Sequence, residues 1–469
     1  MLAERRRSQL RPLVVALLAS GLIASACSTT ESEPVIAATT TTTAPRVATT
    51  SSSTTTTVPL FVEIAVEVDE EPEVATVLST FYTWVADRDA PQPALPDGLA
   101  AQLADPQPSD TYSLHAELSQ EGVVGMGVAG VATVEGEDII LLVNDLDATG
   151  ENLTGWRVVG AWLARHDLEP WFGEPIRHVM IIGTDARDWQ DPVRFRADSL
   201  HIVSSNTAEG GGGILGFPRD SWIEAPYGTD KFTHVNAITW TTSDKQVAED
   251  LDRLQTDPYF GYAARWLGFD RLVEMIRKGP LGAEVTVDVA EQLTGLPLEG
   301  YLLTGFRDFQ LLLNDYGGIE IDVPFAMADA SSGAYFVAGV QEMWGRFALA
   351  FSRNRHLVGG DFTRSLHQGM VILARLNGAR ESGFSTLPWL LSGLAKNTWT
   401  DLSLEQLLTL GAGALLLDPD NVGNRVLPGR IATRGGASVV LIADSAEELY
   451  RALDDGILED EEWPVASSQ

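Results

Sequence analysis

The spacing of apolar residues changes near residue 178, so the chain contains two kinds of pattern. In the first part, Val74, Val77, Leu78 and Phe81 recur near helical spacing and predict a helix over residues 73–84. Three later stretches are rich in β-forming residues and are interrupted by Gly, Asp and Asn, which is typical of strands; they are residues 123–134, 138–143 and 156–164. This pattern predicts a small α+β accessory domain over residues 61–170.

From residue 178 onward, short apolar stretches alternate with longer helical tracts. The expected strands are residues 179–183, 200–203, 214–217, 301–303 and 319–323. The expected helices are residues 242–254, 267–278 and 287–293. Strands interleaved with helices of this length favour an α/β sandwich, which we assign to residues 171–456. Residues 457–469 form an acidic tail.

The first 60 residues predict export and anchoring. Arg5, Arg6, Arg7 and Arg11 precede an apolar run over residues 13–23, and small residues then precede Cys27. The run is shorter than the ~20 residues of a membrane span, so residues 1–26 are interpreted as a signal peptide. Cys27 resembles the acylated cysteine of a bacterial lipoprotein; the alternative is an ordinary signal peptide with an incidental cysteine. We expect the protein to be exported and lipid-anchored at the outer face of the cytoplasmic membrane.

Composition narrows the possible partners and the sources of stability. Residues 27–60 contain the lipidated Cys27 and then a Thr/Ser-rich stretch with too few apolar residues to fold, so it is expected to be a disordered tether. The formal net charge of −33 makes nucleic acid a poor partner. Cys27 is the only cysteine, so no disulfide within the chain supports the fold.

Charged residues collect where the expected strands of the second part begin or end. Those near the first three strands are Asp185, Arg187, Arg196, Asp198 and Arg219. Functional residues of α/β sheets gather at strand ends, so these five are expected around one edge. Farther along, Arg353 and Arg355 precede a helix on which Asp361, Arg364 and Gln368 share one face, being three and then four residues apart.

These residue types suit a phosphate ester. Guanidinium groups bind phosphate oxygens bidentately, which an ammonium group cannot do. Two carboxylates among them would repel the phosphate unless a cation lay between, and Mg²⁺ takes one or two carboxylates together with phosphate oxygens. Phosphoryl transfer needs little beyond positioning and charge neutralisation. The alternative for any single Asp–Arg pair is a surface salt bridge, whereas the whole set favours a phosphate site.

Seven short motifs, in this order and rough spacing, resemble those of the LytR-CpsA-Psr (LCP) family: Gly183-Thr184-Asp185-Ala186-Arg187, Arg196-Ala197-Asp198-Ser199, Pro218-Arg219-Asp220, Val235-Asn236-Ala237, Gly317-Gly318-Ile319, Arg353-Asn354-Arg355 and Asp361-Phe362-Thr363-Arg364. The resemblance spans residues 175–429. It implies a three-layer α/β/α sandwich with an apolar tunnel for a polyprenyl tail, preceded here by the small α+β accessory domain.

The resemblance also implies roles for individual residues. Asp185 and Asp198 would be the Mg²⁺-associated carboxylates. Asp361 would accept the proton of the incoming hydroxyl or, alternatively, hold Arg364 in place. The pyrophosphate would contact Arg196, Arg219, Arg353, Arg355, Arg364 and Gln368, with Arg219 also catalytic and Arg187 in a less defined role.

Three positions depart from the family pattern. His234 stands where the family usually has Lys, His367 stands where it has Arg, and Gly369 stands where a second Gln often follows Gln368. The two histidines would be protonated substrate-binding groups or, alternatively, neutral spacers.

The resemblance implies an enzyme of cell-wall assembly. A phosphate-linked glycopolymer would pass from a polyprenyl-pyrophosphate carrier to peptidoglycan, in a Mg²⁺-dependent reaction. Two alternatives remain open: a polyprenyl-pyrophosphate hydrolase, with water as the acceptor, and a non-catalytic protein that binds a polyprenyl-linked glycan.

Overall fold

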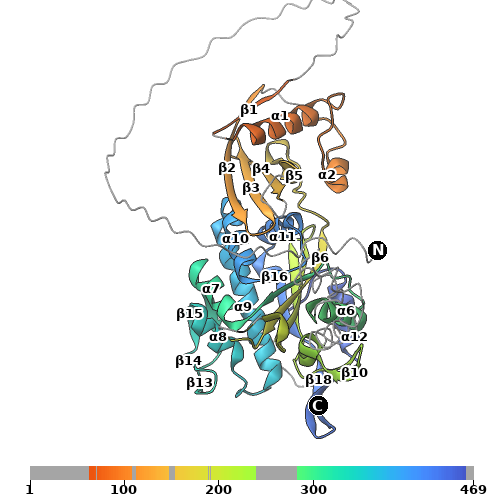
Figure 1. The fold of residues 1–469 in the computed structure, drawn as a ribbon, viewed down its shortest axis with the longest axis vertical. Coiled ribbons are helices and arrows are strands. Elements are labelled where there is room, and N and C mark those ends of the chain that lie inside the picture. The colour runs from red at the N-terminus through yellow and green to blue at the C-terminus, as the bar shows by residue number, and fades with distance from the viewer. Residues whose placement is uncertain are drawn as a thin grey trace, which may run out of the picture.

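The computed structural model describes residues 63–69, 71–107, 112–146, 154–187, 190, 192–238 and 282–460. The signal peptide, Cys27 and its tether lie outside these residues, as do the helices expected at 242–254 and 267–278 and the tail beyond residue 460. Within the described ranges, no helix is both long and apolar enough to cross a membrane. The two largest sheets lie one above the other along the long axis of the molecule (Figure 1).

The first sheet has five strands in the order β1-β2-β3-β4-β5. Their bounds are Ala65–Val68, Ser113–Val123, Gly127–Val134, Asp138–Asp145 and Arg157–Trp162. Strand β1 lies parallel to β2 and the other neighbours are antiparallel. Helices α1 (Pro72–Ala86) and α2 (Asp97–Gln102) cover one face, where Leu78 and Phe81 pack against Ile140 and Leu142. The predicted α+β unit and its first helix are therefore confirmed.

One strand prediction in this region is wrong. Residues 123–134 form the end of β2, a turn and then β3, instead of a single strand. Gly125 in the turn has φ of 72°, a conformation that glycine adopts at little cost. The chain therefore reverses direction within a stretch whose β-forming residues predicted one continuous strand.

The second sheet has six strands in the order β16-β11-β6-β7-β8-β17. Their bounds are Trp399–Thr400, Tyr301–Thr304, Ile176–Thr184, Ala197–Asn206, Gly211–Gly216 and Val422–Val426. Strand β6 pairs with β7 in antiparallel and with β11 in parallel orientation. The expected strands at 179–183, 200–203, 214–217 and 301–303 all fall in this sheet.

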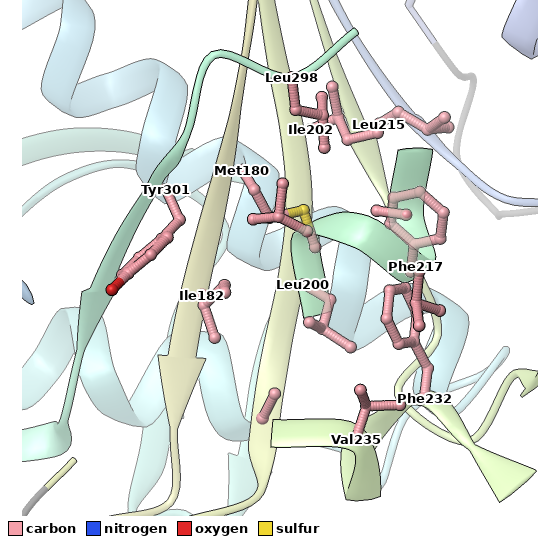
Figure 2. Packing of buried hydrophobic residues seen from close by; sticks show 14 of the residues in the cluster. Met180, Ile182, Leu200, Ile202, Leu215, Phe217, Phe232, Val235, Leu298 and Tyr301 are labelled. Atoms are coloured by element: carbon pink, nitrogen blue, oxygen red, sulfur yellow. The ribbon is translucent and has the colours of Figure 1, made fainter. Parts of the chain in front are cut away.

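Helices cover both faces of the second sheet, as the side-chain alternation in β6 requires. Met180 and Ile182 point to one face, where they pack with α6 (Gly282–Thr294) and α12 (Ala446–Leu453) (Figure 2). Val179 and Ile181 point to the other face, which is covered by α9 (Asp361–Ser382), α10 (Leu387–Asn397) and α11 (Leu404–Leu416) (Figure 1). The three-layer α/β/α sandwich is therefore confirmed.

Smaller elements surround the end of α9. Helices α7 (Phe306–Asp315) and α8 (Gly345–Arg353) pack together beside it. Four two-stranded sheets complete the fold: β9 (Trp222–Ala225) with β10 (Gly228–Lys231), β12 (Ile319–Val323) with β15 (Gly339–Met343), β13 (Met327–Asp329) with β14 (Ala334–Phe336), and β18 (Gly429–Arg434) with β19 (Ala437–Ile442). Short 3-10 turns lie at Ala164–His166, Pro192–Arg194, Phe384–Thr386 and Pro419–Asn421.

The two sheets share a hydrophobic core. Leu141 and Val143 of β4 pack with Leu407 and Leu408 of α11, which also covers the larger sheet. Arg157 of β5 adds an ion pair across the junction, with its Nη2 3.0 Å from a carboxylate oxygen of Glu405. The accessory sheet is therefore packed on both faces, and the domain boundaries drawn from the sequence stay predictions.

Candidate functional site

A cavity of about 480 Å³ lies between the ends of β6, β7 and β11 and helices α7, α8 and α9. Part of its wall is apolar and consists of Ile181, Phe306, Phe309, Leu349, Val371 and Ile372. Another part carries charged and amide side chains, which are Asp198, Arg353, Arg355, Arg364 and Gln368. The cavity can therefore accommodate a ligand that has both an apolar and an anionic portion.

The strand register brings the two predicted metal carboxylates together. Strands β6 and β7 pair so that Thr184 lies opposite Ala197, and the Asp185 amide donates to the Arg196 carbonyl at 3.0 Å. Asp185 thus directly follows β6, and Asp198 lies at the start of the neighbouring strand β7. Burial raises the pKa of Asp185, and the nearby charge of Asp198 raises it further. The pair carries negative charge that the protein only partly compensates.

Arginines pair with these carboxylates unequally. Arg219 donates a hydrogen bond from Nη1 to Asp198. Arg196 pairs more weakly with Asp185: its Nη2 lies 3.3 Å from the carboxylate, and the Arg196 side chain is 55% exposed. Burial opposes the charge of Arg219, but the pKa of this guanidinium is raised overall because Asp198 lies against it. One oxygen of Asp185, Oδ1, is buried and has no hydrogen-bond partner among the described residues. That oxygen is positioned to ligate a cation.

The donor set fits a magnesium ion that is shared with phosphate. Among the described residues, no group of three or more His, Cys, Asp or Glu side chains could hold a metal by itself. Asp185 and Asp198 would supply two oxygen ligands, and Mg²⁺ commonly completes its shell with waters and phosphate oxygens. The fit rests on the unpartnered Oδ1 of Asp185.

Two further arginines reach the cavity from α8 and α9. Arg364 is only 2% exposed, and burial lowers its pKa although Asp361 opposes the shift. Its Nη2 lies 2.7 Å from Asp361 Oδ1. Burial also lowers the pKa of Arg353, whose guanidinium lies 4.5 Å from the centre of the Phe306 ring. Buried cations with incomplete partners are costly in free energy, so this arrangement favours binding of an anion.

Gln368 links the helix to the sheet. Its Nε2 donates to the Asp198 carbonyl at 3.3 Å and to the Ser352 carbonyl at 3.2 Å. Arg364 and Gln368 both line the cavity, as their spacing of four residues on α9 predicts. The strand that carries Asp198 and the two helices that carry the arginines are therefore fixed relative to one another.

Comparison with known proteins identifies the family of the chain. A model of the LytR_cpsA_psr family matches residues 174–454. The chain belongs to the LytR-CpsA-Psr family.

Individual relatives match parts of the chain. Cell wall biosynthesis protein LcpA of Corynebacterium glutamicum is 29% identical over 208 residues, which cover 44% of this chain and 37% of LcpA. The polyisoprenyl-teichoic acid–peptidoglycan teichoic acid transferase TagU of Oceanobacillus iheyensis is 25% identical over 280 residues, covering 58% of this chain and 73% of TagU. The crystal structure of Bacillus subtilis TagV aligns with a TM-score of 0.44 and 18% identity, over 60% of this chain and 95% of TagV. This chain therefore spans little more than a third of LcpA.

Several residues named from the LCP motifs lie beside the cavity and not in its wall. Asp361 contacts Arg364, and Arg219 contacts Asp198, so both act on residues that line the cavity. Arg187 is exposed, and it is not one of the described residues that form the wall. His234 likewise lies outside the wall, with its Nδ1 3.1 Å from Asp230 Oδ1. Their assignment as substrate ligands stays a prediction.

His367, where the LCP family usually has Arg, is turned away from the cavity. Its ring is fully buried and stacks on Phe351, with ring centroids 4.4 Å apart. Burial lowers the pKa of His367 to about 4. Of the two interpretations of this histidine, the structure supports the neutral spacer.

Gly369, where the LCP family often has Gln, faces a side chain that occupies the missing space. A Cβ atom at Gly369 would overlap the amide of Asn424 in β17. The Asn424 amide is held there because its Nδ2 donates to the Leu366 carbonyl at 2.9 Å. Glycine at position 369 therefore permits α9 to pack closely against β17.

Sequence reasoning missed part of the cavity wall. His356, which belongs to none of the motifs, lines the cavity together with Ser331 and Ser332. The one available signal was its place directly after Arg353-Asn354-Arg355. The serines could not be found by pattern because they lie in the turn between β13 and β14, outside the motifs, and reach the site only through tertiary packing.

Proposed function

We propose that this protein transfers a phosphate-linked glycopolymer from a polyprenyl-pyrophosphate carrier to peptidoglycan. The observation that carries the proposal is the division of one cavity into an apolar wall and a wall with three arginines and a carboxylate. A polyprenyl chain suits the first and a pyrophosphate suits the second. LCP relatives named as teichoic acid–peptidoglycan transferases support the same reaction class.

The residues of the chain would act mainly by positioning charge. Arg353, Arg355 and Arg364 would bind the pyrophosphate oxygens and stabilise the charge that develops at the transferring phosphorus. Arg219 would hold Asp198 in place, and Gln368 would hold the strand against the helices. Asp185 and Asp198 would hold Mg²⁺, which when bound supplies neutralisation of phosphate charge.

The reaction exchanges one phosphate ester partner for another. A hydroxyl oxygen of peptidoglycan forms a bond to the phosphorus that bears the glycan. The bond from that phosphorus to the bridging oxygen breaks, and polyprenyl phosphate leaves with the electron pair. The apolar wall would keep the lipid in place while the hydroxyl approaches. Export and a lipid anchor at Cys27 would place the enzyme at the membrane surface, where this donor is held.

A transfer assay with the full chain tests the proposal. The protein is incubated with a polyprenyl-pyrophosphate glycan and a peptidoglycan oligomer, with and without Mg²⁺, and the products are followed by mass spectrometry. We expect joined product only with Mg²⁺, and loss of at least ~100-fold in rate for Asp198→Asn. Asp97→Asn, at an exposed position in the accessory sheet's helix α2, is the matched control.

Each other outcome points elsewhere. Free glycan phosphate without joined product would indicate a hydrolase. Donor that is bound and returned intact, with or without Mg²⁺, would indicate a binding protein. Unchanged transfer by Asp198→Asn would overturn the site.

A further inference from the structure

A cluster of polar residues forms the part of the cavity wall that the family motifs do not include. Asp329 ends β13, Ser331 and Ser332 form the turn that follows, and His356 precedes α9. Ser331, Ser332 and His356 line the same cavity as Asp198 and the arginines. The cluster therefore faces the space in which the phosphate is expected.

Asp329 is held firmly as a carboxylate. It is 8% exposed, and its oxygens accept hydrogen bonds from the Ser331 hydroxyl at 2.8 Å and the Ser332 hydroxyl at 2.5 Å. The amides of Ser331 and Ser332 donate to it at 3.1 and 3.0 Å. The Ser332 hydroxyl is the largest cause of a lowered pKa at Asp329. This carboxylate accepts hydrogen bonds and has no proton to donate.

The carboxylate fixes the orientation of the imidazole. His356 Nδ1 lies 2.9 Å from Asp329 Oδ1, so Nδ1 carries the proton of the neutral ring. Nε2 then keeps a lone pair. The His356 side chain is 71% exposed and lines the cavity, so this nitrogen is accessible to a ligand. A histidine oriented by a buried carboxylate is an arrangement that suits a general base.

The other carboxylates near the cavity are less suited to accept a proton. Both oxygens of Asp361 are buried without a hydrogen-bond partner, Arg364 Nη2 lies 2.7 Å from one of them, and Asp361 is not among the described residues that form the cavity wall. Asp198 is bonded to Arg219, and in the proposed function it also holds a cation. A carboxylate held by a guanidinium is a weak base because the cation stabilises its charged form.

We propose that His356, oriented by Asp329, is the general base that accepts the proton of the peptidoglycan hydroxyl, and that Ser331 and Ser332 bind the acceptor sugar beside it. This inference rests on the proposed transfer function. The serine hydroxyls donate to Asp329, while Ser332 Oγ accepts the Ala334 amide at 3.4 Å and Ser331 Oγ lies 3.2 Å from His356 Nδ1. A hydroxyl oxygen has two lone pairs, so each serine keeps one for a sugar hydroxyl. The acceptor would thus enter past the β13–β14 turn, which lines the same cavity as Asp198.

The step balances without a further reactant. The acceptor O–H bond breaks and its proton moves to Nε2 of His356. The oxygen forms its bond to the phosphorus, and polyprenyl phosphate leaves. Asp329 stabilises the resulting imidazolium, which loses its proton to solvent before the next turnover.

The test separates proton acceptance from binding. His356→Ala removes the imidazole, His356→Asn keeps a donor toward Asp329 but removes the base, and His115→Asn changes an exposed histidine of β2 as the control. We measure kcat, the KM for a peptidoglycan oligomer, and the Kd of the full chain for a polyprenyl-pyrophosphate disaccharide. We expect both His356 variants to lose ~100-fold or more in kcat with donor Kd unchanged, and His115→Asn to match the wild type. Added imidazole should restore part of the rate of His356→Ala.

The outcomes distinguish this inference from the function on which it rests. Wild-type transfer together with full activity in His356→Asn would overturn the base and leave the function standing. A rise in acceptor KM with unchanged kcat would make His356 a binding residue only, and loss of donor affinity would assign it to the donor; either result overturns the base. Absence of transfer by the wild type would overturn both proposals.

Discussion

His367 stacks on Phe351 with an angle of 13° between the two rings, and this contact ties α9 to α8. A second ring, that of Phe325, lies 6.1 Å away, and the imidazole also hydrogen-bonds to the Phe351 backbone. The position that carries a cation elsewhere in the LCP family is here part of the core. In the proposed function, the remaining cations of the cavity, Arg353, Arg355 and Arg364, would therefore bind the phosphate without it.

We predict that His367→Arg will lower stability without increasing donor affinity. A guanidinium at this place would be buried among aromatic rings, and an unpaired buried charge costs several kcal/mol. For a chain of this size, each kcal/mol lowers Tm by about 2–4 °C. His367→Phe, which keeps the stack, should melt near the wild type and retain transfer. Tighter donor binding by His367→Arg, measured by titration with a polyprenyl-pyrophosphate disaccharide, would contradict the neutral role.

We predict that the free energy of unfolding will fall as pH decreases from about 6.5 toward 4. Burial lowers the pKa of His367 and of His201 to about 4, whereas an unfolded histidine titrates near ~6.5. The unfolded chain therefore binds more protons in this interval, and acid favours unfolding. Each imidazole contributes up to about 3 kcal/mol of this loss. Urea unfolding at stepped pH measures it, and His367→Phe should remove its own share of the slope; an unchanged slope would refute the assignment.

The roles of Asp361 can be separated by a double-mutant cycle with Arg364. If Asp361 only positions the guanidinium, Arg364→Lys should reduce kcat/KM by roughly 10–100-fold, since a lysine cannot form bidentate contacts. Adding Asp361→Asn to Arg364→Lys should then cause little further loss of kcat/KM, because both changes disturb the same ion pair. Multiplicative losses in kcat, with donor Kd unchanged, would instead assign Asp361 a separate chemical role.

We predict that Asp185→Asn will stabilise the metal-free protein while weakening its response to Mg²⁺. Burial and then the charge of Asp198 raise the pKa of Asp185, so its ionised form is unfavourable in the folded state near neutral pH. The neutral amide removes that cost, and we expect Tm to rise by a few °C without Mg²⁺. Thermal unfolding with a polyprenyl-pyrophosphate disaccharide, with and without Mg²⁺, provides the measurement. A Mg²⁺-dependent shift as large as that of the wild type would exclude Asp185 as a ligand.

The sequence was sufficient for the sandwich because its buried strands are continuous apolar stretches, as residues 179–183 show. It was insufficient where glycine takes part in packing. Strand β8 begins at Gly211, three residues before the expected start, and its first three residues are glycines. A side chain at Gly213 would meet Leu453 and Leu458, so glycine is needed there for packing. Glycine favours turns by propensity, so close contact between a strand and its neighbours is invisible to a pattern.

The candidate site divides in the same way. Asp198, Arg353, Arg355 and Arg364 are carried by motifs, Gln368 follows Arg364 by four residues on one helix face, and the structure brings all five to one cavity. His356 and Ser331 were not predicted, since they meet through Asp329, which lies 27 residues before His356. Contacts between distant segments are set by tertiary packing and leave no local periodicity to detect.

The contact between Gly369 and Asn424 supplies a prediction about how α9 is seated. Gly369→Ala should destabilise the protein by about 1–3 kcal/mol, since its Cβ would overlap the Asn424 amide in a tightly packed region. Gly378→Ala, on the same helix, should instead stabilise by about 0.5–1 kcal/mol, because its Cβ would meet only Arg375 Nη1, at a van der Waals distance of 3.6 Å. Adding Asn424→Ala to Gly369→Ala should recover part of the loss, although it removes the hydrogen bond to the Leu366 carbonyl. Urea unfolding of the four variants completes the cycle, and strictly additive losses would show that the two side chains do not compete for this space.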